Sequence, residues 1–401
     1  MITVEEAFDI LDRNIRVLPE IKVDIASSSG YILSKNIISS DNIPFSDNSA
    51  MDGFAVISRN TENAAPENPV KLEIIGEAPA GIPFTGSLKA GQAVSIMTGG
   101  VIPQGADAVI KIEDTEDGGK YVKILKEVVP GENIRPAGED ILKNSKVLSA
   151  GEQIGPAEMG VLASIGCTEV PVYKKPRVTF LITGTELIDP DEPLIPGKVR
   201  NSNFYSLSGL LETCNVDSVN LGRCGDSLES IKNWLDQGRE ADIIITTGAV
   251  SMGKYDFIRD AFGELGGKQL FWKVAQRPGK PLFFGNLKGI PVFGLPGNPV
   301  SVMVSFLIYV KRALYRMQNR NTEYPDWLKA ELIKEYKKVK DLTYFARGIY
   351  SQKNNSLVVE SVEKQGSGML SSMHQGNCLI KFNSGTNKVL PDEIVDILIL
   401  K

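Results

Sequence analysis

Three short apolar segments of this chain each run into a glycine-bearing turn that carries polar side chains. They are 178–182 followed by TGTEL (183–187), 242–245 followed by TTGAVSMGKYD (246–256), and 290–293 followed by GLPGNPVS (294–301). Glycine lets the backbone approach a ligand, and a helix that starts just after a turn offers free N–H groups to an anion. Ordinary βα turns also contain Gly and Pro. Three such turns, with Glu186 and Asp256 beside them, favour one shared ligand site.

A cationic turn lies between two of these segments. In the RPGKP turn (277–281), Arg277 and Lys280 are each followed by a proline. Residues 251–290 hold seven Lys/Arg against three Asp/Glu, although the net charge of the chain is −5. Most charged runs are solvated loops. Arg and Lys are nevertheless the side chains that hold phosphate and other oxyanions, and a helix is predicted to start nearby at Pro299. The turn is therefore a candidate oxyanion clamp.

The scarcity of histidine limits the chemistry. His374 is the only histidine and lies in a polar segment, so a site with two His ligands from one chain is excluded and an exposed imidazole is expected. The four cysteines contain no C-x-x-C pair, which argues against a zinc site or a disulfide framework and fits a reducing cytoplasm. Chemistry is expected to rest on carboxylates, Lys/Arg, hydroxyl groups and a hard cation held by oxygen.

Composition indicates an ordinary multidomain protein of 401 residues, with 42% hydrophobic and 23% charged residues. The longest nearly apolar stretch, 300–310, is broken by serines and is too short to cross a bilayer. Residues 1–13 are acidic and amphipathic, which is not typical of a signal peptide. The acidic balance gives no reason to expect nucleic acid. We therefore expect a cytoplasmic protein that binds neither nucleic acid nor a membrane.

The periodicity of apolar residues predicts a multidomain α/β plus β fold. Short alternating strands predict an inserted small β domain at 49–140, and its flanks, 1–48 and 141–175, form an elongated α+β lobe. Residues 176–321 alternate strands and helices, which predicts a doubly wound, mostly parallel sheet. Alternation returns in 322–401, which predicts a C-terminal β barrel.

Individual elements follow from the same patterns. A capping box, Thr3–Glu6, begins a first helix that is predicted to run to about Leu18, and Pro156 suits the first position of a second helix. In the αβ region, strands are predicted at 178–182, 217–221, 242–245, 269–274 and 290–293, and helices at 203–213, 228–237, 256–265 and 299–317.

Eight segments, in order along nearly the whole chain, resemble the molybdopterin molybdenumtransferases. They are SAMDGFAV (49–56), MTGG-x-x-P-x-GADAV (97–109), RPAGEDI (135–141), TGTEL, TTGAVSMGKYDF, RPGKPL, GLPGNPVS and QGSGMLSSM (365–373). This bacterial family also resembles one domain of the receptor-anchoring protein gephyrin. The resemblance implies insertion of molybdate into adenylylated molybdopterin with release of AMP, assisted by Mg²⁺.

The same resemblance implies the site residues. Those expected to bind the two anionic substrates are Thr98, Ser251, Arg277, Lys280, Pro281, Pro296, Asn298, Ser301, Arg347 and Ser367. The carboxylates expected to be functional are Asp52, Asp140, Glu186, Asp226 and Asp256. Carboxylates repel an anionic substrate unless a cation intervenes, so Glu186 and Asp256 are expected to handle Mg²⁺. Asp140 could instead cap or hinge a turn, and Asp226 could cap the helix predicted at 228–237.

The resemblance also implies partners. Family members are homodimers whose sites join the β-domain edge of one chain to the αβ region of the other, which would bring Asp52 and Asp140 into play. The molybdopterin adenylyltransferase is a further expected partner. Two other functions remain open. The adenylyltransferase itself is a single domain with a TTGGTG-type turn, whereas this turn reads TTGAVSMGKYD. A non-catalytic scaffold would be signalled by loss of the carboxylates or of the Arg277/Lys280 pair.

Overall fold

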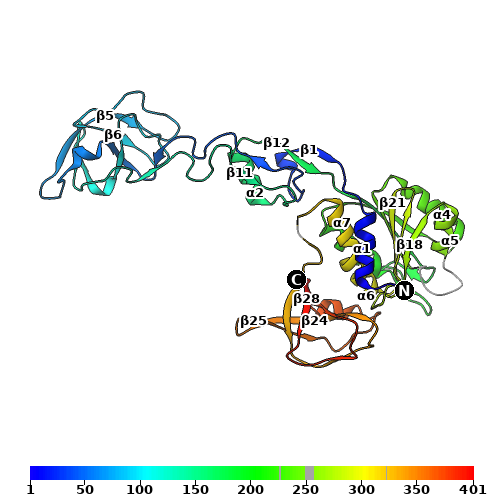
Figure 1. The fold of residues 1–401 in the computed structure, drawn as a ribbon. Helices are drawn as coiled ribbons and strands as arrows, with labels where there is room; N and C mark the ends of the chain where they lie inside the picture. Colours follow the sequence, from blue (N-terminus) through cyan, green and yellow to red (C-terminus); the bar gives the residue numbers. More distant parts are fainter. Residues whose placement is uncertain (225–226, 249–256, 322) are drawn as a thin grey trace.

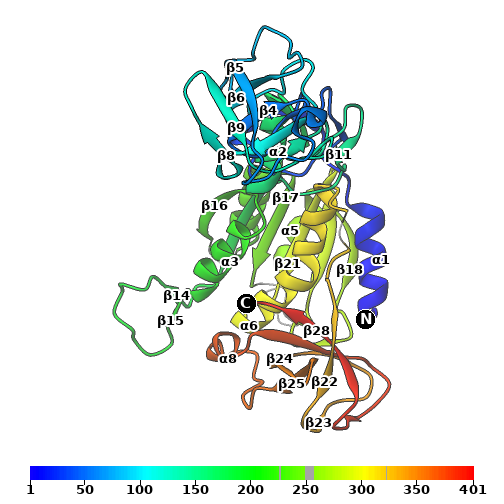
Figure 2. The same cartoon turned by 90° about the vertical axis from the view of Figure 1, so that its left-hand side faces the viewer.

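The computed structural model describes residues 1–224, 227–248, 257–321 and 323–401. The molecule is elongated, with a small β module at one end, a narrow middle part, and an αβ unit next to a β barrel at the other end (Figure 1). Figure 2 looks at the molecule from the side of the β module and shows the barrel below the αβ unit. Among the described residues, no helix has the length and apolar character needed to cross a membrane.

A six-stranded sheet forms the centre of the αβ unit, in the order β16-β13-β17-β21-β20-β18. The first four strands run parallel: β16 (Asp217–Cys224), β13 (Arg177–Thr183), β17 (Ile243–Thr247) and β21 (Ile290–Leu295). The prediction of a mostly parallel sheet is confirmed. Because β13, β17 and β21 are parallel neighbours, their carboxyl ends meet at one edge of the sheet.

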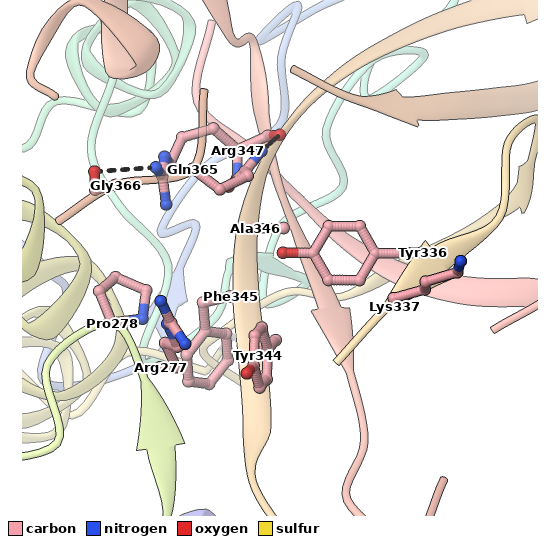
Figure 3. Close-up of a pocket in the computed structure, with 10 residues that line it drawn as sticks. All are labelled: Arg277, Pro278, Tyr336, Lys337, Tyr344, Phe345, Ala346, Arg347, Gln365 and Gly366. Atoms are coloured by element: carbon pink, nitrogen blue, oxygen red, sulfur yellow. Dashed lines mark hydrogen bonds between the residues drawn. The ribbon is translucent and has the colours of Figure 1, made fainter. Parts of the chain in front are cut away.

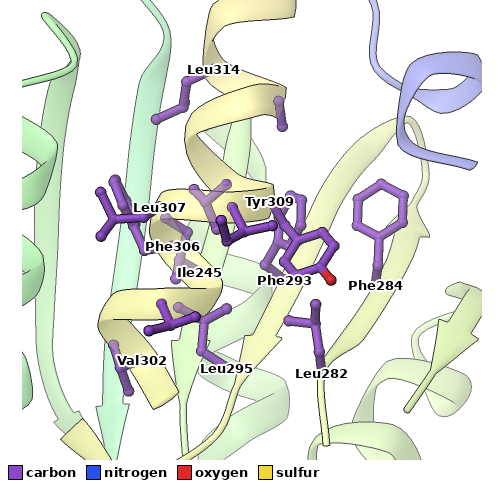
Figure 4. Close-up of a cluster of buried hydrophobic side chains, with 14 of the residues drawn as sticks. Ile245, Leu282, Phe284, Phe293, Leu295, Val302, Phe306, Leu307, Tyr309 and Leu314 are labelled. Atoms are coloured by element: carbon purple, nitrogen blue, oxygen red, sulfur yellow. The ribbon is translucent and has the colours of Figure 1, made fainter. Parts of the chain in front are cut away.

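Helices cover both faces of this sheet. On one face lie α1 (Val4–Asn14), α3 (Ser202–Glu212), and a continuous helix made of α6 (Pro299–Ser305), the π-helical turn η5 (Phe306–Val310) and α7 (Lys311–Met317). On the other lie α4 (Leu228–Gln237) and α5 (Phe257–Glu264). Alternate strand residues face alternate helix layers: Ile243 and Ile245 pack on the first face, and Ile244 packs on the second. Figure 4 shows the first face, with the yellow helix against the sheet.

The sheet ends in a hairpin that the sequence did not predict. Strand β20 (Phe283–Leu287) pairs antiparallel with β21 and with β18 (Lys268–Trp272). Lys288 and Gly289 join β20 to β21, and their positive φ angles of 53° and 100° suit a two-residue hairpin turn. Lysine is an unusual first residue for such a turn, so composition did not signal it.

The structure also shows where two predicted helices begin and end. The capping box at Thr3 and Glu6 is present, but α1 ends at Asn14 rather than near Leu18. Ile15 is extended, with φ −93° and ψ 124°, and the Leu18 N–H donates to the Met317 carbonyl at 2.8 Å instead of continuing the helix. Helix α2 (Pro156–Ser164) has its proline at the first turn, as predicted.

The β module is a six-stranded sheet with apolar clusters on both faces. Its strands, in the order β7-β4-β6-β5-β9-β8, are β7 (Ala108–Lys111), β4 (Gly53–Val56), β6 (Gln92–Ile96), β5 (Val70–Ala78), β9 (Tyr121–Ile124) and β8 (Thr115–Asp117). The middle part consists of strand pairs that join residues before the module to residues after it. They are β1 (Glu20–Asp24) with β12 (Glu169–Tyr173), β2 (Ile37–Ile38) with β11 (Lys146–Leu148), and β3 (Asn48–Ser49) with β10 (Ile134–Arg135).

The C-terminal strands close into a five-stranded barrel, as predicted. Around the barrel they are β24 (Thr343–Lys353), β25 (Ser356–Ser361), β22 (Leu328–Leu332), β28 (Ile394–Ile399) and β26 (Cys378–Phe382), which pairs again with β24. The short pair β23 (Tyr336–Lys337) and β27 (Lys388–Val389) and helix α8 (Ser371–Gln375) accompany it. Strand β19 (Gln276–Arg277) of the αβ unit pairs with β24, so the cationic turn is joined to the barrel.

Candidate functional site

The described parts of the three glycine-bearing turns, which for the second turn are residues 246–248, lie together at the carboxyl edge of the sheet. The Thr183 hydroxyl, at the end of β13, donates to the Thr247 carbonyl of β17 at 2.9 Å. A Cβ atom on Gly248 (φ +83°) would lie 2.6 Å from that hydroxyl, and one on Gly297 would lie 3.7 Å from the Gly248 Cα. The Asn203 amide of α3 holds the Gly297 carbonyl at 2.8 Å. Glycine is needed at Gly248 because both its φ angle and its neighbour exclude a side chain.

Glu186 lies within the first of these turns and is exposed. A Cβ on Gly184 would lie 2.9 Å from a Glu186 carboxylate oxygen, so the glycine leaves space for that carboxylate. The strand pair β14 (Leu187–Ile188) and β15 (Val199–Arg200) borders an open cavity of about 550 Å³, lined by Gly184, Lys198 and Arg223 among others. This cavity places two cationic side chains close to the Glu186 turn.

The cationic turn borders a second cavity, of about 340 Å³. Seven of the ten predicted substrate-binding residues line it: Arg277, Lys280, Pro281, Pro296, Asn298, Ser301 and Ser367. Arg277 and Lys280 are exposed, and within the described part of the chain no carboxylate forms an ion pair with either. Two unpaired cations beside serine hydroxyls form a site suited to an oxyanion.

Hydrogen bonds fix the two sides of this oxyanion cavity to each other. The Asn298 amide donates to the Ser367 hydroxyl at 3.1 Å, and the Val300 N–H donates to the Ser367 carbonyl at 3.1 Å. Ser367 comes from a barrel loop, whereas Asn298 and Val300 begin α6. The Arg277 guanidinium also lies 5.8 Å from the ring of Tyr344 on β24. The barrel therefore completes a cavity that begins on the αβ sheet.

Arg347 lies beside this cavity and is almost entirely buried, with 1% of its surface exposed. Its Nε donates to the Ser372 hydroxyl at 3.0 Å, and its Nη2 donates to the Lys364 and Gly366 carbonyls at 3.3 and 3.2 Å. Burial lowers the pKa of its guanidinium. Figure 3 shows it above a neighbouring cavity of about 330 Å³ that Arg277 also lines. Its hydrogen bonds hold the loop that carries Ser367.

Several residues around the two cavities were missed by sequence reasoning. Gln365 lines both cavities, and its amide nitrogen donates to the Arg347 and Val362 carbonyls at 2.8 Å. Gln365 belongs to the QGSGMLSSM segment, and this motif is the sequence signal that could have identified it as a site residue. Gln276 and Tyr344 were also missed, because nothing in the sequence showed that β19 would pair with β24.

Asp52 and Thr98 form a second, separate group in the β module. The Thr98 backbone N–H and hydroxyl both donate to one Asp52 carboxylate oxygen, at 2.7 and 2.8 Å. These two bonds lower the pKa of Asp52 because they stabilise its charged form. Asp140 is exposed at the junction of the module with the middle part. In one chain, this module lies far from the αβ unit (Figure 1).

We expect Thr98→Val to raise the pKa of Asp52 toward its ordinary value, because the substitution removes the hydroxyl donor. A ¹³C NMR titration of the carboxyl group measures this. Thr115→Val is the matched control, since that hydroxyl, in the same module, donates to the Ile112 carbonyl instead. An unchanged Asp52 titration in Thr98→Val would show that the hydroxyl does not stabilise the carboxylate.

Three predicted residues, Ser251, Asp226 and Asp256, lie outside the described residues. Across the ranges that the structure describes, no group of three or more His, Cys, Asp or Glu side chains is arranged to hold a metal ion. Of the two carboxylates expected to handle Mg²⁺, Glu186 is described and Asp256 is not. His374 is exposed on α8, as expected.

Comparisons with known proteins cover the chain almost from end to end. The MoeA N-terminal region (domain I and II) matches residues 2–166, a probable molybdopterin binding domain matches 179–316, and the MoeA C-terminal region (domain IV) matches 329–400. The molybdopterin molybdenumtransferase of Bacillus subtilis is 34% identical over 384 residues, which cover 94% of this chain and 89% of the relative.

Two further relatives agree. The molybdopterin molybdenumtransferase of Staphylococcus epidermidis is 32% identical over 99% of this chain and 95% of its own length. The crystal structure of the molybdopterin biosynthesis MoeA protein from Pyrococcus horikoshii superposes over the full length of both chains, with a TM-score of 0.83 and 30% identity. On the strength of its motifs, its fold and these full-length relatives, the chain belongs to the MoeA family of molybdopterin molybdenumtransferases.

Proposed function

We propose that this protein inserts molybdate into adenylylated molybdopterin and releases AMP. The observation that carries the proposal is that Arg277 and Lys280, which form no ion pair with any carboxylate of the described residues, share a cavity with Ser301 and Ser367. Molybdate is a tetrahedral dianion. Cationic donors neutralise such an ion, and hydroxyl groups bind its remaining oxygens while still allowing release.

The pterin substrate carries phosphate groups and needs a second cationic surface. Lys198 and Arg223 line the cavity that begins at the Glu186 turn, where Arg223 is also ion-paired with Asp189 and Glu192, and Gly184 lines the same cavity. Because the oxyanion cavity also begins at this edge of the sheet, we infer that the phosphates lie over the turns and the dithiolene faces Lys280. The chain's own residues then act mainly by binding and orienting two anions against each other.

Mg²⁺ fits this arrangement. Proteins commonly hold Mg²⁺ through one or two carboxylates together with substrate phosphates, and Glu186 offers an exposed carboxylate in the space left by Gly184. Glu186, with Asp256 as the second candidate, would hold the ion. When bound, Mg²⁺ neutralises phosphate charge that the carboxylates would otherwise repel.

A homodimer with shared sites would explain the position of Asp52 and Thr98. Exposed apolar side chains occur in the same part of the chain, including Phe45 and Met97, and another set borders the Glu186 cavity, including Ile195 and Val199. One chain leaves both sets uncovered, whereas a second copy could cover one with the other. We further propose that the protein works in the cytoplasm and receives its substrate from the molybdopterin adenylyltransferase.

Mixing two impaired variants tests the shared site. At a molybdate concentration far below the KM of Lys280→Ala, Asp52→Asn and Lys280→Ala should each be nearly inactive as homodimers, but a re-associated equal mixture should recover about a quarter of wild-type activity, because half of the dimers carry one intact site. Activity of the mixture is compared with that of each variant alone. As a control, Asp52→Asn mixed with a double variant carrying both changes should recover nothing. A mixture no more active than its parts would contradict a shared site.

The reaction is tested by incubating the protein with adenylylated molybdopterin and Mg²⁺, with and without molybdate, and following AMP release. We expect release that depends on molybdate and that chelation of Mg²⁺ suppresses. Tight pterin binding without turnover would instead indicate a carrier or scaffold.

A further inference from the structure

Beneath the cationic turn lies a chain of buried hydrogen bonds that ends on a tyrosine. The Gln276 side chain is fully buried, and its amide nitrogen donates to the Gly279 carbonyl at 3.2 Å. Its amide oxygen accepts a hydrogen bond from the hydroxyl of Tyr309, which is also fully buried. Gly279 lies between Arg277 and Lys280, so this series of hydrogen bonds reaches the middle of the turn that carries both cations.

The position of Tyr309 depends on a local irregularity of the helix. Residues Phe306–Val310 form a π-helical turn, in which the Lys311 N–H donates to the Phe306 carbonyl. Such a turn inserts an extra residue and changes the direction of the side chains, and it occurs frequently at functional sites. In Figure 4 the tyrosine leaves the helix toward Leu282 and Phe284, beside the strand that follows the cationic turn. Its ring also packs against Phe8 of α1, with centroids 5.6 Å apart.

The tyrosine hydroxyl holds the second end of the Gln276 amide. Burial raises the pKa of Tyr309, so the hydroxyl remains a proton donor. The phenol donor binds the amide oxygen of Gln276 while the Gly279 carbonyl accepts from the amide nitrogen, so both partners select one orientation. Without the hydroxyl, the buried amide oxygen loses its donor and the Gly279 carbonyl alone orients the side chain, so Gln276 and the turn can shift.

The turn has little freedom to compensate. Gly279 has a φ of +86°, and a Cβ atom there would lie 2.7 Å from the Ser305 hydroxyl and 2.9 Å from the Gln276 amide nitrogen. The turn therefore rests directly on the helix that carries Tyr309. A shift of Gln276 changes the position of the Gly279 backbone, and with it the placement of both cations.

We propose that Tyr309 is a positioning residue for the oxyanion clamp: through Gln276 it fixes the turn on which Arg277 and Lys280 sit, and so sets the affinity for molybdate. This inference rests on the proposed function, since it names the support of the same molybdate site. Tyr309 does not touch the substrate, and its effect should appear in binding rather than in the rate at saturation.

The test is Tyr309→Phe, which removes one oxygen and keeps the ring. Losing one buried donor should weaken molybdate binding about tenfold in equilibrium dialysis and raise KM for molybdate by a similar factor, with kcat changed less than about twofold. Ile308→Val is the matched control, because it alters the same buried π-helical turn without touching Gln276. Gln276→Met, which removes the whole relay at similar volume, should give the same loss.

The outcomes separate the inference from the function on which it rests. If wild-type protein binds molybdate and turns over, and Tyr309→Phe does so with the same affinity, the positioning role is wrong and the proposed function stands. Equal losses in Ile308→Val and Tyr309→Phe would also overturn it, because loosening of the helix would then be the cause. If Tyr309→Phe fails to fold, wild-type affinity in Gln276→Met would overturn it instead. Failure of the wild-type protein to bind molybdate would refute the proposed function itself.

Discussion

Lys280→Ala should weaken molybdate binding between about tenfold and a hundredfold. A hydrogen bond to a charged group contributes about 1.5–3 kcal/mol, and the Lys280 ammonium has no competing ion pair within the described residues. Arg277 remains in the cavity, so binding should weaken rather than disappear. The loss is measured by equilibrium dialysis of molybdate at fixed ionic strength.

A charge-matched control separates contact from net charge. Lys268, on strand β18 of the αβ sheet, is also exposed, but it does not line the oxyanion cavity. Lys268→Ala should bind molybdate as the wild type does. Because both lysines are exposed, neither substitution should change the thermal unfolding midpoint appreciably. Equal weakening in both variants would mean that the field of the whole protein, rather than this cavity, attracts the anion.

Arg347→Leu should have the largest effect on stability, lowering the free energy of unfolding of the barrel by about 3 kcal/mol or more. The substitution removes the hydrogen bonds of a charged donor to the buried Ser372 hydroxyl and to the part-buried Lys364 and Gly366 carbonyls, and each bond to a charged group contributes about 1.5–3 kcal/mol. Molybdate affinity should fall as well, since the freed loop carries Ser367. Urea unfolding followed by the fluorescence of Trp327, which stacks on Phe345 of β24, measures the first effect once Trp234 and Trp272 of the αβ unit are replaced by Phe.

Arg277→Ala is the comparison variant for this experiment. Arg277 lines the same neighbouring cavity as Arg347 but is exposed. It should therefore weaken molybdate binding without lowering stability. If Arg347→Leu unfolds like the wild type but loses molybdate affinity, its guanidinium contacts the substrate directly and the positional role derived from its hydrogen bonds is wrong.

Local pattern was sufficient for much of the fold. Period-two alternation and buried apolar runs located β13, β17 and β21, and capping signals located the starts of α1 and α2. The predictions were wrong where tertiary contacts determine the end of a helix or the presence of a strand. Ile15 leaves the helix so that the following segment can reach Met317, and β20 depends on a hairpin turn that begins with lysine.

The candidate site likewise contains residues that the sequence predicted and residues that it did not. The residues within the RPGKP and GLPGNPVS motifs, such as Lys280 and Ser301, were identified from type and spacing together with the family resemblance, and they share one cavity. The buried role of Arg347 was not predictable, because it depends on carbonyls of a loop seventeen to nineteen residues further along. Tyr309 and Gln276 look like ordinary core residues in sequence. Their relation appears only when a π-helical turn and a cationic turn pack together.

The roles of the carboxylates remain predictions, as do those of the residues that line the oxyanion cavity. Asp52 is paired with Thr98, forty-six positions away, across neighbouring strand ends of the β module. Glu186 lies at the sheet edge as expected from the strand pattern. Asp226 and Asp256 fall outside the described residues, so their roles rest on the family resemblance. Their substitution is informative once the reaction itself has been measured.

The most direct measurement is the amount of molybdenum bound to the pterin, set against the amount of AMP released, after incubation with adenylylated molybdopterin, molybdate and Mg²⁺. We expect wild-type protein to transfer molybdenum and release AMP in equal amounts, and Lys280→Ala to need far more molybdate to do so. AMP release without molybdenum on the pterin, or no release despite bound pterin, would contradict the proposed insertion reaction.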